Sequence, residues 1–114
     1  MRLISQDGTI DVPYDCFSLT IATGKYEDVE VACIYCHNLS SPKGTKLAEY
    51  SSKEKAEKAM EMLSESYNNY VFAINLFSYE MLKSYANSHS KEEFNELAYP
   101  YFRFPADEDL EVRQ

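Results

Sequence analysis

The sequence predicts an α+β fold, in which an N-terminal antiparallel sheet of about five short strands packs with two to three C-terminal helices. Residues 16–36 alternate apolar and polar side chains with a period of two, as half-buried strands do. Residues 51–67 instead repeat apolar side chains at three- and four-residue steps, which is the period of a helix. Because strand patterns precede this segment and helix patterns follow it, the two kinds of structure are segregated along the chain.

The length of 114 residues is typical of one domain, large enough to bury a single core without disulfides or metal. We expect a single domain over residues 1–114. Its sheet is expected in residues 1–50 and its helical half in residues 51–98. An aromatic segment and an acidic, frayed tail are expected over residues 99–114.

The sheet is expected to open with a hairpin in residues 3–12. Its turn contains Asp7-Gly8, and Asp-Gly supplies the positive φ angles that a two-residue hairpin turn needs. Two alternating strands follow, joined by a turn at residues 23–25, and together they favour antiparallel pairing. Residues 38–44 have the composition of a loop, and residues 45–50 form a further short strand.

The first helix is expected over residues 51–67. Ser51 and Glu54 have the spacing of a capping box, in which each side chain satisfies a backbone N–H at the helix start. Asn68-Asn69 is expected to end this helix.

Residues 70–85 are apolar almost all the way round, and an ordinary surface helix of a monomer would not be so apolar. This segment is either enclosed within the domain or part of a homo-oligomer interface, and the small sheet favours the interface. Residues 70–77 could alternatively begin as a strand. A short helix at residues 91–98 completes the helical half.

The formal net charge of −8, from 19 acidic and 11 basic side chains, argues against binding to long DNA or RNA, because such a surface repels phosphate backbones. No apolar run approaches the roughly 20 residues of a membrane span. The first residues carry no export signal, so we expect a cytoplasmic protein whose three cysteines are free thiols.

The sequence CIYCH at residues 33–37 matches the pattern for covalent c-type haem attachment. Residues three apart on a strand point to opposite faces, so Cys33 and Cys36 are not expected to reach one porphyrin edge. Zinc held by these thiols and His37, with Cys16 or His89, is the stronger metal hypothesis. An isolated C-x-x-C pair is weak support for it, and we expect neither a metal nor a cofactor.

Catalytic groups are not evident either. His37 and His89 have no recognisable partner that would orient them as bases, and the three glycines form no phosphate loop. The carboxylates of residues 107–111 are interpreted as a solvated charge run. We therefore expect a binding protein with no catalytic residue.

The aromatic segment YFRF at residues 101–104 places Arg103 among three rings. A planar guanidinium beside rings suits a nucleotide, because it binds phosphate bidentately while a ring stacks on the base. Alternatively, the three rings belong to a C-terminal strand that closes the core, with Arg103 pointing to water, and aromatic residues more often serve packing.

Three stretches of the chain carry a family resemblance: residues 3–14 (LISQDGTIDVPY), 50–58 (YSSKEKAEK) and 101–108 (YFRFPADE). They resemble the Thoeris anti-defence type 1 family, the signal-sequestering sponges of phages and prophages of Firmicutes. The resemblance implies an antiparallel sheet with C-terminal helices, assembled as dimers or hexamers. It implies sequestration, without turnover, of cyclic ADP-ribose isomers made by bacterial TIR-domain proteins, or of cyclic oligonucleotides, in the host cytosol during infection.

In that family a phenylalanine and an asparagine on the helical half bind the ligand together with C-terminal arginines. The resemblance therefore implies Phe77, Asn87, Arg103 and Arg113 as ligand-binding residues, and the ring of Tyr101 beside Arg103 is added as a stacking candidate. The alternative function is a prophage protein-interaction module that masks a host protein through the apolar face of residues 70–85.

Overall fold

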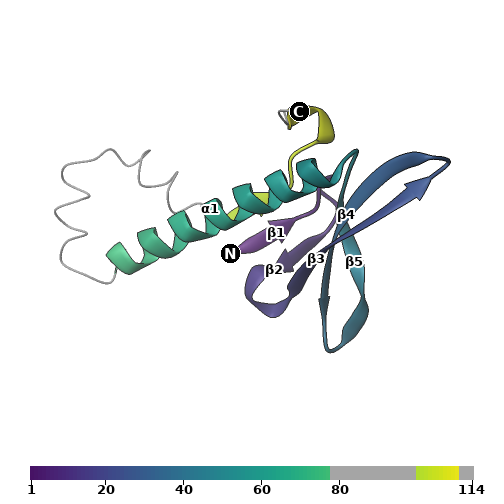
Figure 1. The fold of residues 1–114 in the computed structure, drawn as a ribbon. Coiled ribbons are helices and arrows are strands. Elements are labelled where there is room, and N and C mark those ends of the chain that lie inside the picture. The colour runs from purple at the N-terminus through teal and green to yellow at the C-terminus, as the bar shows by residue number, and fades with distance from the viewer. Residues whose placement is uncertain (78–99, 111–114) are drawn as a thin grey trace.

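The computed structural model describes residues 1–77 and 100–110, which form two three-stranded sheets and one long helix (Figure 1). The elements are β1 (Arg2–Ile4), β2 (Asp11–Pro13), β3 (Ser18–Tyr26), β4 (Val29–Asn38), β5 (Ser41–Tyr50), α1 (Lys53–Phe77) and β6 (Tyr101–Arg103), with short 3-10 turns at Tyr14–Cys16 and Asp107–Asp109. The α+β class is confirmed. The expected arrangement of about five strands with two to three helices is wrong for these residues, and the expected helix at 91–98 lies outside them.

The larger sheet has the strand order β3-β4-β5, with both pairs antiparallel. Its first hairpin turns at Glu27 and Asp28, whose φ angles of 52° and 63° are those of a type I′ turn. The turn expected at residues 23–25 is therefore wrong. The strands pair without a bulge from Ser18–His37 to Tyr26–Val29, so Gly24 lies inside β3.

β5 begins at Ser41, so the loop expected over residues 38–44 is wrong for most of its length. The side-chain oxygen of Asn38 accepts a hydrogen bond of 2.9 Å from the Ser41 N–H and closes a short turn. Gly44 then permits the pairing of β5 with β4, because its φ is +84° and a β-carbon there would lie 3.1 Å from the Cys36 carbonyl oxygen.

The smaller sheet has the order β2-β1-β6, in which β6 pairs parallel with β1. The turn between β1 and β2 is wider than the expected two-residue type. Ser5 N–H donates to the Ile10 carbonyl oxygen over 2.8 Å, and Gly8 N–H donates to the Ser5 carbonyl oxygen over 2.9 Å. Gly8 alone in this turn has a positive φ, of 79°.

The helix α1 is continuous through Asn68 and Asn69, so the break expected there is wrong. An asparagine costs a helix less than about 0.7 kcal/mol relative to alanine, whereas a second helix would need a new nucleus. The N-cap is Ser52, whose hydroxyl oxygen accepts a hydrogen bond from the Lys55 N–H over 3.2 Å. The cap therefore lies one residue after the predicted Ser51, and the predicted capping box with Glu54 is wrong, because the third helical residue after Ser52 is Lys55. In the described residues no helix combines the length and apolar character required to cross a bilayer.

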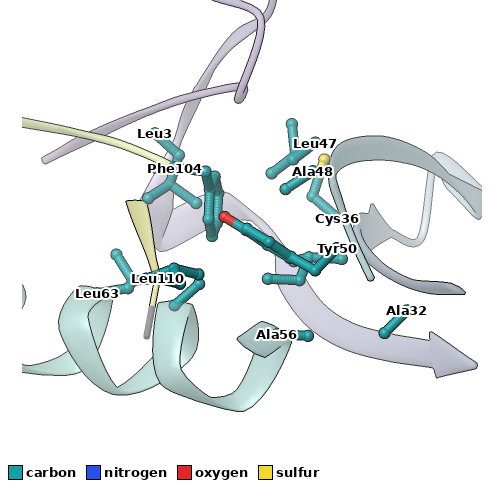
Figure 2. Packing of buried hydrophobic residues seen from close by; sticks show 12 residues of the cluster. Leu3, Ala32, Cys36, Leu47, Ala48, Tyr50, Ala56, Leu63, Phe104 and Leu110 are labelled. Carbon is teal, nitrogen blue, oxygen red and sulfur yellow. The ribbon is translucent and has the colours of Figure 1, made fainter. Parts of the chain in front are cut away.

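The core lies between the two sheets and the first half of α1 (Figure 2). Leu3, Tyr50, Leu63 and Phe104 are among its largest fully buried side chains. The second half of α1 extends past the sheets in Figure 1. The alternative interpretation of the aromatic segment, a C-terminal strand that closes the core, is therefore confirmed for β6 and Phe104.

The chain after β6 is packed against the start of α1, and the expectation of a frayed acidic tail is wrong as far as Leu110, which is only 5% exposed. The Asp107 carboxylate accepts a hydrogen bond of 2.7 Å from the Ser51 N–H and an ion-pair contact of 3.2 Å from Lys55 Nζ. Burial by itself would raise the pKa of Asp107, but these donors lower it below its ordinary value of 3.8. Residues 111–114 lie outside the described part of the chain.

Candidate functional site

The parallel pairing of β6 with β1 brings the two ends of the chain together on one surface. Tyr101 lies opposite Arg2, and Arg103 lies opposite Ile4. Because side chains alternate along a strand and paired residues share a face, these four side chains lie on one face of the β2-β1-β6 sheet. The opposite face carries Leu3, which is completely buried. We call the surface formed by Arg2, Ile4, Tyr101 and Arg103 the outer face of the small sheet.

Arg103 is exposed, and its guanidinium rests on the turn that follows β1. Its Nη2 donates a hydrogen bond of 3.2 Å to the Gln6 carbonyl oxygen. Its Cζ and Nη2 atoms each lie 3.2 Å from the position that a β-carbon on Gly8 would occupy. A residue with a side chain at position 8 would therefore push the guanidinium away, in addition to adopting a strained backbone conformation. The absence of a side chain at Gly8 therefore leaves the space that the guanidinium of Arg103 occupies.

Gln6 connects this turn to the rest of the molecule through all of its polar groups. Its N–H donates to the Leu47 carbonyl oxygen over 2.8 Å, and its side-chain oxygen accepts from the Glu49 N–H over 3.0 Å. Its side-chain Nε2 donates to the Pro105 carbonyl oxygen over 3.1 Å. Together with the Arg103 contact, these bonds join the small sheet, β5 and the C-terminal segment. They therefore fix the position of the turn on which the guanidinium of Arg103 lies.

The same turn is stabilised by Asp7. Its Oδ1 accepts hydrogen bonds of 2.7 Å from the Ser5 hydroxyl, 2.7 Å from the Thr9 hydroxyl and 3.0 Å from the Thr9 N–H. The hydrogen bond from Ser5, followed by those from Thr9, lowers the pKa of Asp7 to about 2. Asp7 is therefore ionised at neutral pH, and its Oδ1 is already committed to the turn.

Arg2, on the same face, forms an ion pair of 2.8 Å with Asp11 that is half exposed on both sides. The remaining ion pairs in residues 1–77 and 100–110 involve lysines, and none of them includes Arg103. The described residues thus supply no carboxylate that neutralises Arg103, and an exposed guanidinium in this state is suited to an external anion.

The predicted ligand-binding residues have different outcomes. Tyr101 and Arg103 lie on the outer face of the small sheet, two residues apart on β6. Phe77 is the last residue of α1, and its side chain is not described. Asn87 and Arg113 lie outside the described residues. That these five residues form one ligand-binding site therefore stays a prediction.

Sequence reasoning did not select Arg2, Gln6 or Gly8 for the site. Gly8 carried the one available signal, because a glycine in a turn indicates a positive φ or a close approach. The proximity of Arg2 and Gln6 to Arg103 depends on the parallel pairing of β1 with β6, for which the sequence contains no local signal.

The cysteines of the CIYCH segment lie on β4 and point to opposite faces, as the strand alternation predicts. Cys36 is in the core, and Cys33 lies on the other face with its Sγ 3.8 Å from Glu49 Oε1. Burial raises the pKa of both thiols, and the Glu49 charge adds to this effect at Cys33. Within residues 1–77 and 100–110 no three His, Cys, Asp or Glu side chains are placed so that they could share a metal ion.

A shallow depression of about 500 Å³ lies where β3 begins and β4 ends, and Asp15, Cys16, Ser18 and His37 are among its lining residues. The Nε2 atom of His37 is buried there without a hydrogen-bond partner among the described residues. Arg103 is not part of this depression. The depression is therefore separate from the outer face of the small sheet.

Comparison of the chain with protein-family models, with curated proteins and with solved structures gives no match.

Proposed function

We propose that this protein binds a cyclic ADP-ribose isomer or a cyclic nucleotide that serves as an immune signal, and sequesters it without turnover. In this proposal it is a phage anti-defence protein that acts in the host cytosol. The observation that carries the proposal is Arg103, an exposed guanidinium that rests on Gly8 and has no carboxylate partner in the described residues.

The chemistry of the outer face suits a phosphate attached to a base. In the described part of the chain, the Arg103 guanidinium donates to Gln6 through Nη2, and its other N–H groups could bind a phosphate oxygen. A charge-assisted bond of this kind is stronger than a neutral one. The Cα atoms of Tyr101 and Arg103 are about 6.6 Å apart along β6, and we propose that the ring of Tyr101, which is 39% exposed, stacks on the base. Arg2 lies on the same face, but its guanidinium is already paired with Asp11.

A signal sponge needs affinity and a high concentration of sites rather than catalytic groups. The net charge of −8 provides no long-range attraction for an anion, so the affinity has to come from local contacts. We propose that the protein works as a homo-oligomer, a dimer or a hexamer. The apolar segment after Asn69 is one candidate interface, and Phe72 there is 54% exposed.

The test uses the purified chain with cyclic ADP-ribose isomers and cyclic nucleotides as probes. Native protein should retain a probe and release it intact on heating, and the bound probe should raise the melting temperature, because it binds only the folded state. A degraded product would reveal an enzyme. Retention of no probe would refute the proposal.

Arg103→Ala should weaken binding of the retained probe by roughly ten- to a hundredfold, since a hydrogen bond to a charged group contributes about 1.5–3 kcal/mol. Arg103→Lys should recover part of this loss, because an ammonium lacks the planar fork. Lys58→Ala, an exposed charge change on α1, is the control and should bind as the wild type does. Equal affinity of Arg103→Ala and wild type would remove Arg103 from the site.

A second function, a protein-interaction module that masks a host protein, is favoured by the exposure of Phe72 and Ile74 on α1. These side chains are 54% and 43% exposed, and they lie about 200° apart around the helix, so apolar surface is present on two sides. Light scattering separates the two candidates. A monomer that retains no nucleotide probe favours the interaction module, whereas a ligand-binding oligomer favours the sponge.

A further inference from the structure

The strand β3 is an edge strand of nine residues, and within the described residues only β4 pairs with it. Every side chain of β3 is exposed or half-buried. Edge strands in natural proteins are usually protected by proline, a bulge or several charges. β3 has none of these except Lys25 near its end, and its pairing with β4 is regular along its whole length. Among residues 1–77 and 100–110, therefore, nothing covers the outer edge of β3, and this edge is a continuous template for another strand.

The hairpin turn determines which backbone groups of β3 point outward. A type I′ turn closes on a hydrogen-bonded pair, which here is Tyr26 with Val29. Hydrogen-bonded and non-hydrogen-bonded pairs alternate along an antiparallel ladder. The even-numbered residues of β3 are thus bonded to β4. The outward-pointing N–H and C=O groups belong to the odd-numbered residues Leu19, Ile21, Thr23 and Lys25.

From this geometry we infer that β3 pairs antiparallel with β3 of a second copy of the chain, centred on Ala22. A twofold axis at Ala22 places Ile21 opposite Thr23 of the second copy and Leu19 opposite Lys25. All four outward-pointing residues are then used in both copies, giving about eight intermolecular hydrogen bonds. The result is a continuous six-stranded sheet. This inference rests on β3 and does not depend on the proposed ligand.

The side chains are compatible with a second copy as the partner. Ser18, Thr20, Ala22 and Gly24 all lie on one face of β3, so the cross-strand neighbours on that face of the new pair are small residues. The charged residue of β3, Lys25, lies opposite an apolar Leu19 and far from the second Lys25, so like charges are not opposed. The central pair, Ala22 with its copy, is a non-hydrogen-bonded pair, in which the Cα atoms lie about 4.5 Å apart.

The first test is the mass in solution by light scattering coupled to size-exclusion chromatography. The wild-type chain should run at about twice its monomer mass of 13.2 kDa, or at about six times that mass if three such dimers assemble into the proposed hexamer. Thr23→Pro removes one outward N–H without touching the bonds to β4 and should shift the mass to that of the monomer, while Thr23→Ala, which keeps the N–H, should leave the dimer intact. A wild-type monomer in the hundred-micromolar range overturns the inference, as does a folded Thr23→Pro protein that stays dimeric.

A second test does not depend on the proline variant folding. Ala22→Cys should crosslink two copies on mild oxidation, because a Cα separation of about 4.5 Å is within the range for a disulfide. Cys33 lies opposite Ala22 within the chain and Cys16 is an exposed thiol, so the experiment is done with Cys33→Ala and Cys16→Ala present. Thr20→Cys, which would face Gly24 of the second copy, is the control and should not crosslink. Crosslinking of the control without crosslinking at position 22 overturns the proposed pairing.

Discussion

The carbonyl oxygen of Pro105 is one of the points at which the C-terminal segment is attached to the rest of the protein. It accepts a hydrogen bond of 2.8 Å from the Tyr50 hydroxyl and one of 3.1 Å from Gln6 Nε2. Tyr50 is 1% exposed, and burial raises the pKa of its hydroxyl, which therefore stays protonated as a donor. Because two donors share this one acceptor, we expect the stability losses of Tyr50→Phe and Gln6→Ala to be non-additive.

Tyr50→Phe removes one donor but leaves the Pro105 oxygen bonded to Gln6. We expect a loss of about 1 kcal/mol in the free energy of unfolding, the usual net contribution of one hydrogen bond. Gln6→Ala also leaves the Pro105 oxygen satisfied, through Tyr50, but it loses the bond from the Glu49 N–H as well, so about 1–2 kcal/mol is expected.

The double variant leaves the Pro105 oxygen without either donor. Because Pro105 is only half-buried, we expect this unsatisfied acceptor to cost about 1 kcal/mol, the lower end of the range for a buried one. The double loss should thus exceed the sum of the single losses by about 1 kcal/mol. The assay is urea unfolding of the wild type, both single variants and the double variant as a double-mutant cycle. Additivity within about 0.3 kcal/mol would refute the shared-acceptor reasoning.

Three further predictions concern the turns. Gly8→Ala should lower the free energy of unfolding by about 1 kcal/mol, because φ at this position is +79° and the guanidinium of Arg103 must move. Gly24→Ala should cost less, because the space around its β-carbon position is open. Thermal unfolding of both variants measures the difference. Replacing Glu27 by Asn together with Asp28 by Gly should raise the free energy of unfolding by about 0.5–1 kcal/mol, because both positions have positive φ, and an unchanged urea midpoint would contradict this. The pKa of Asp7 is lowered to about 2 in the folded state, so the stability it contributes is complete above its ordinary pKa of 3.8 and is lost as the pH falls toward 2. The stability difference between wild type and Asp7→Asn should therefore shrink from about pH 5 to about pH 2, and a constant difference would show that the carboxylate charge is not involved.

Local periodicity was enough to predict the fold class and several of its parts. The alternation in β3 and β4 follows from the need to bury one face of each strand, and it placed Cys33 and Cys36 on opposite faces. The helical spacing of Ala56, Ala59 and Leu63 likewise predicted the buried stripe of α1. These features depend on neighbours within a few residues, so they are visible in the sequence alone.

The positions of turns and caps were predicted less well, since they depend on which strands finally pair. The turn between β3 and β4 lies at Glu27 and Asp28 and not at the predicted residues 23–25, because the pairing of β3 with β4 extends to Tyr26. Neither residue is a glycine, so intrinsic turn preference pointed to Gly24 instead.

Only the tertiary structure placed Arg103. Its position depends on β6 pairing with β1 at the other end of the chain, on Gly8 leaving room for the guanidinium, and on Gln6 holding that turn against β5 and Pro105. The sequence showed an arginine among rings and left two interpretations of it open. The physical reason is that strand partners are selected by packing between distant segments, and a pattern of period two reports which face of a strand is buried without reporting which strand lies beside it.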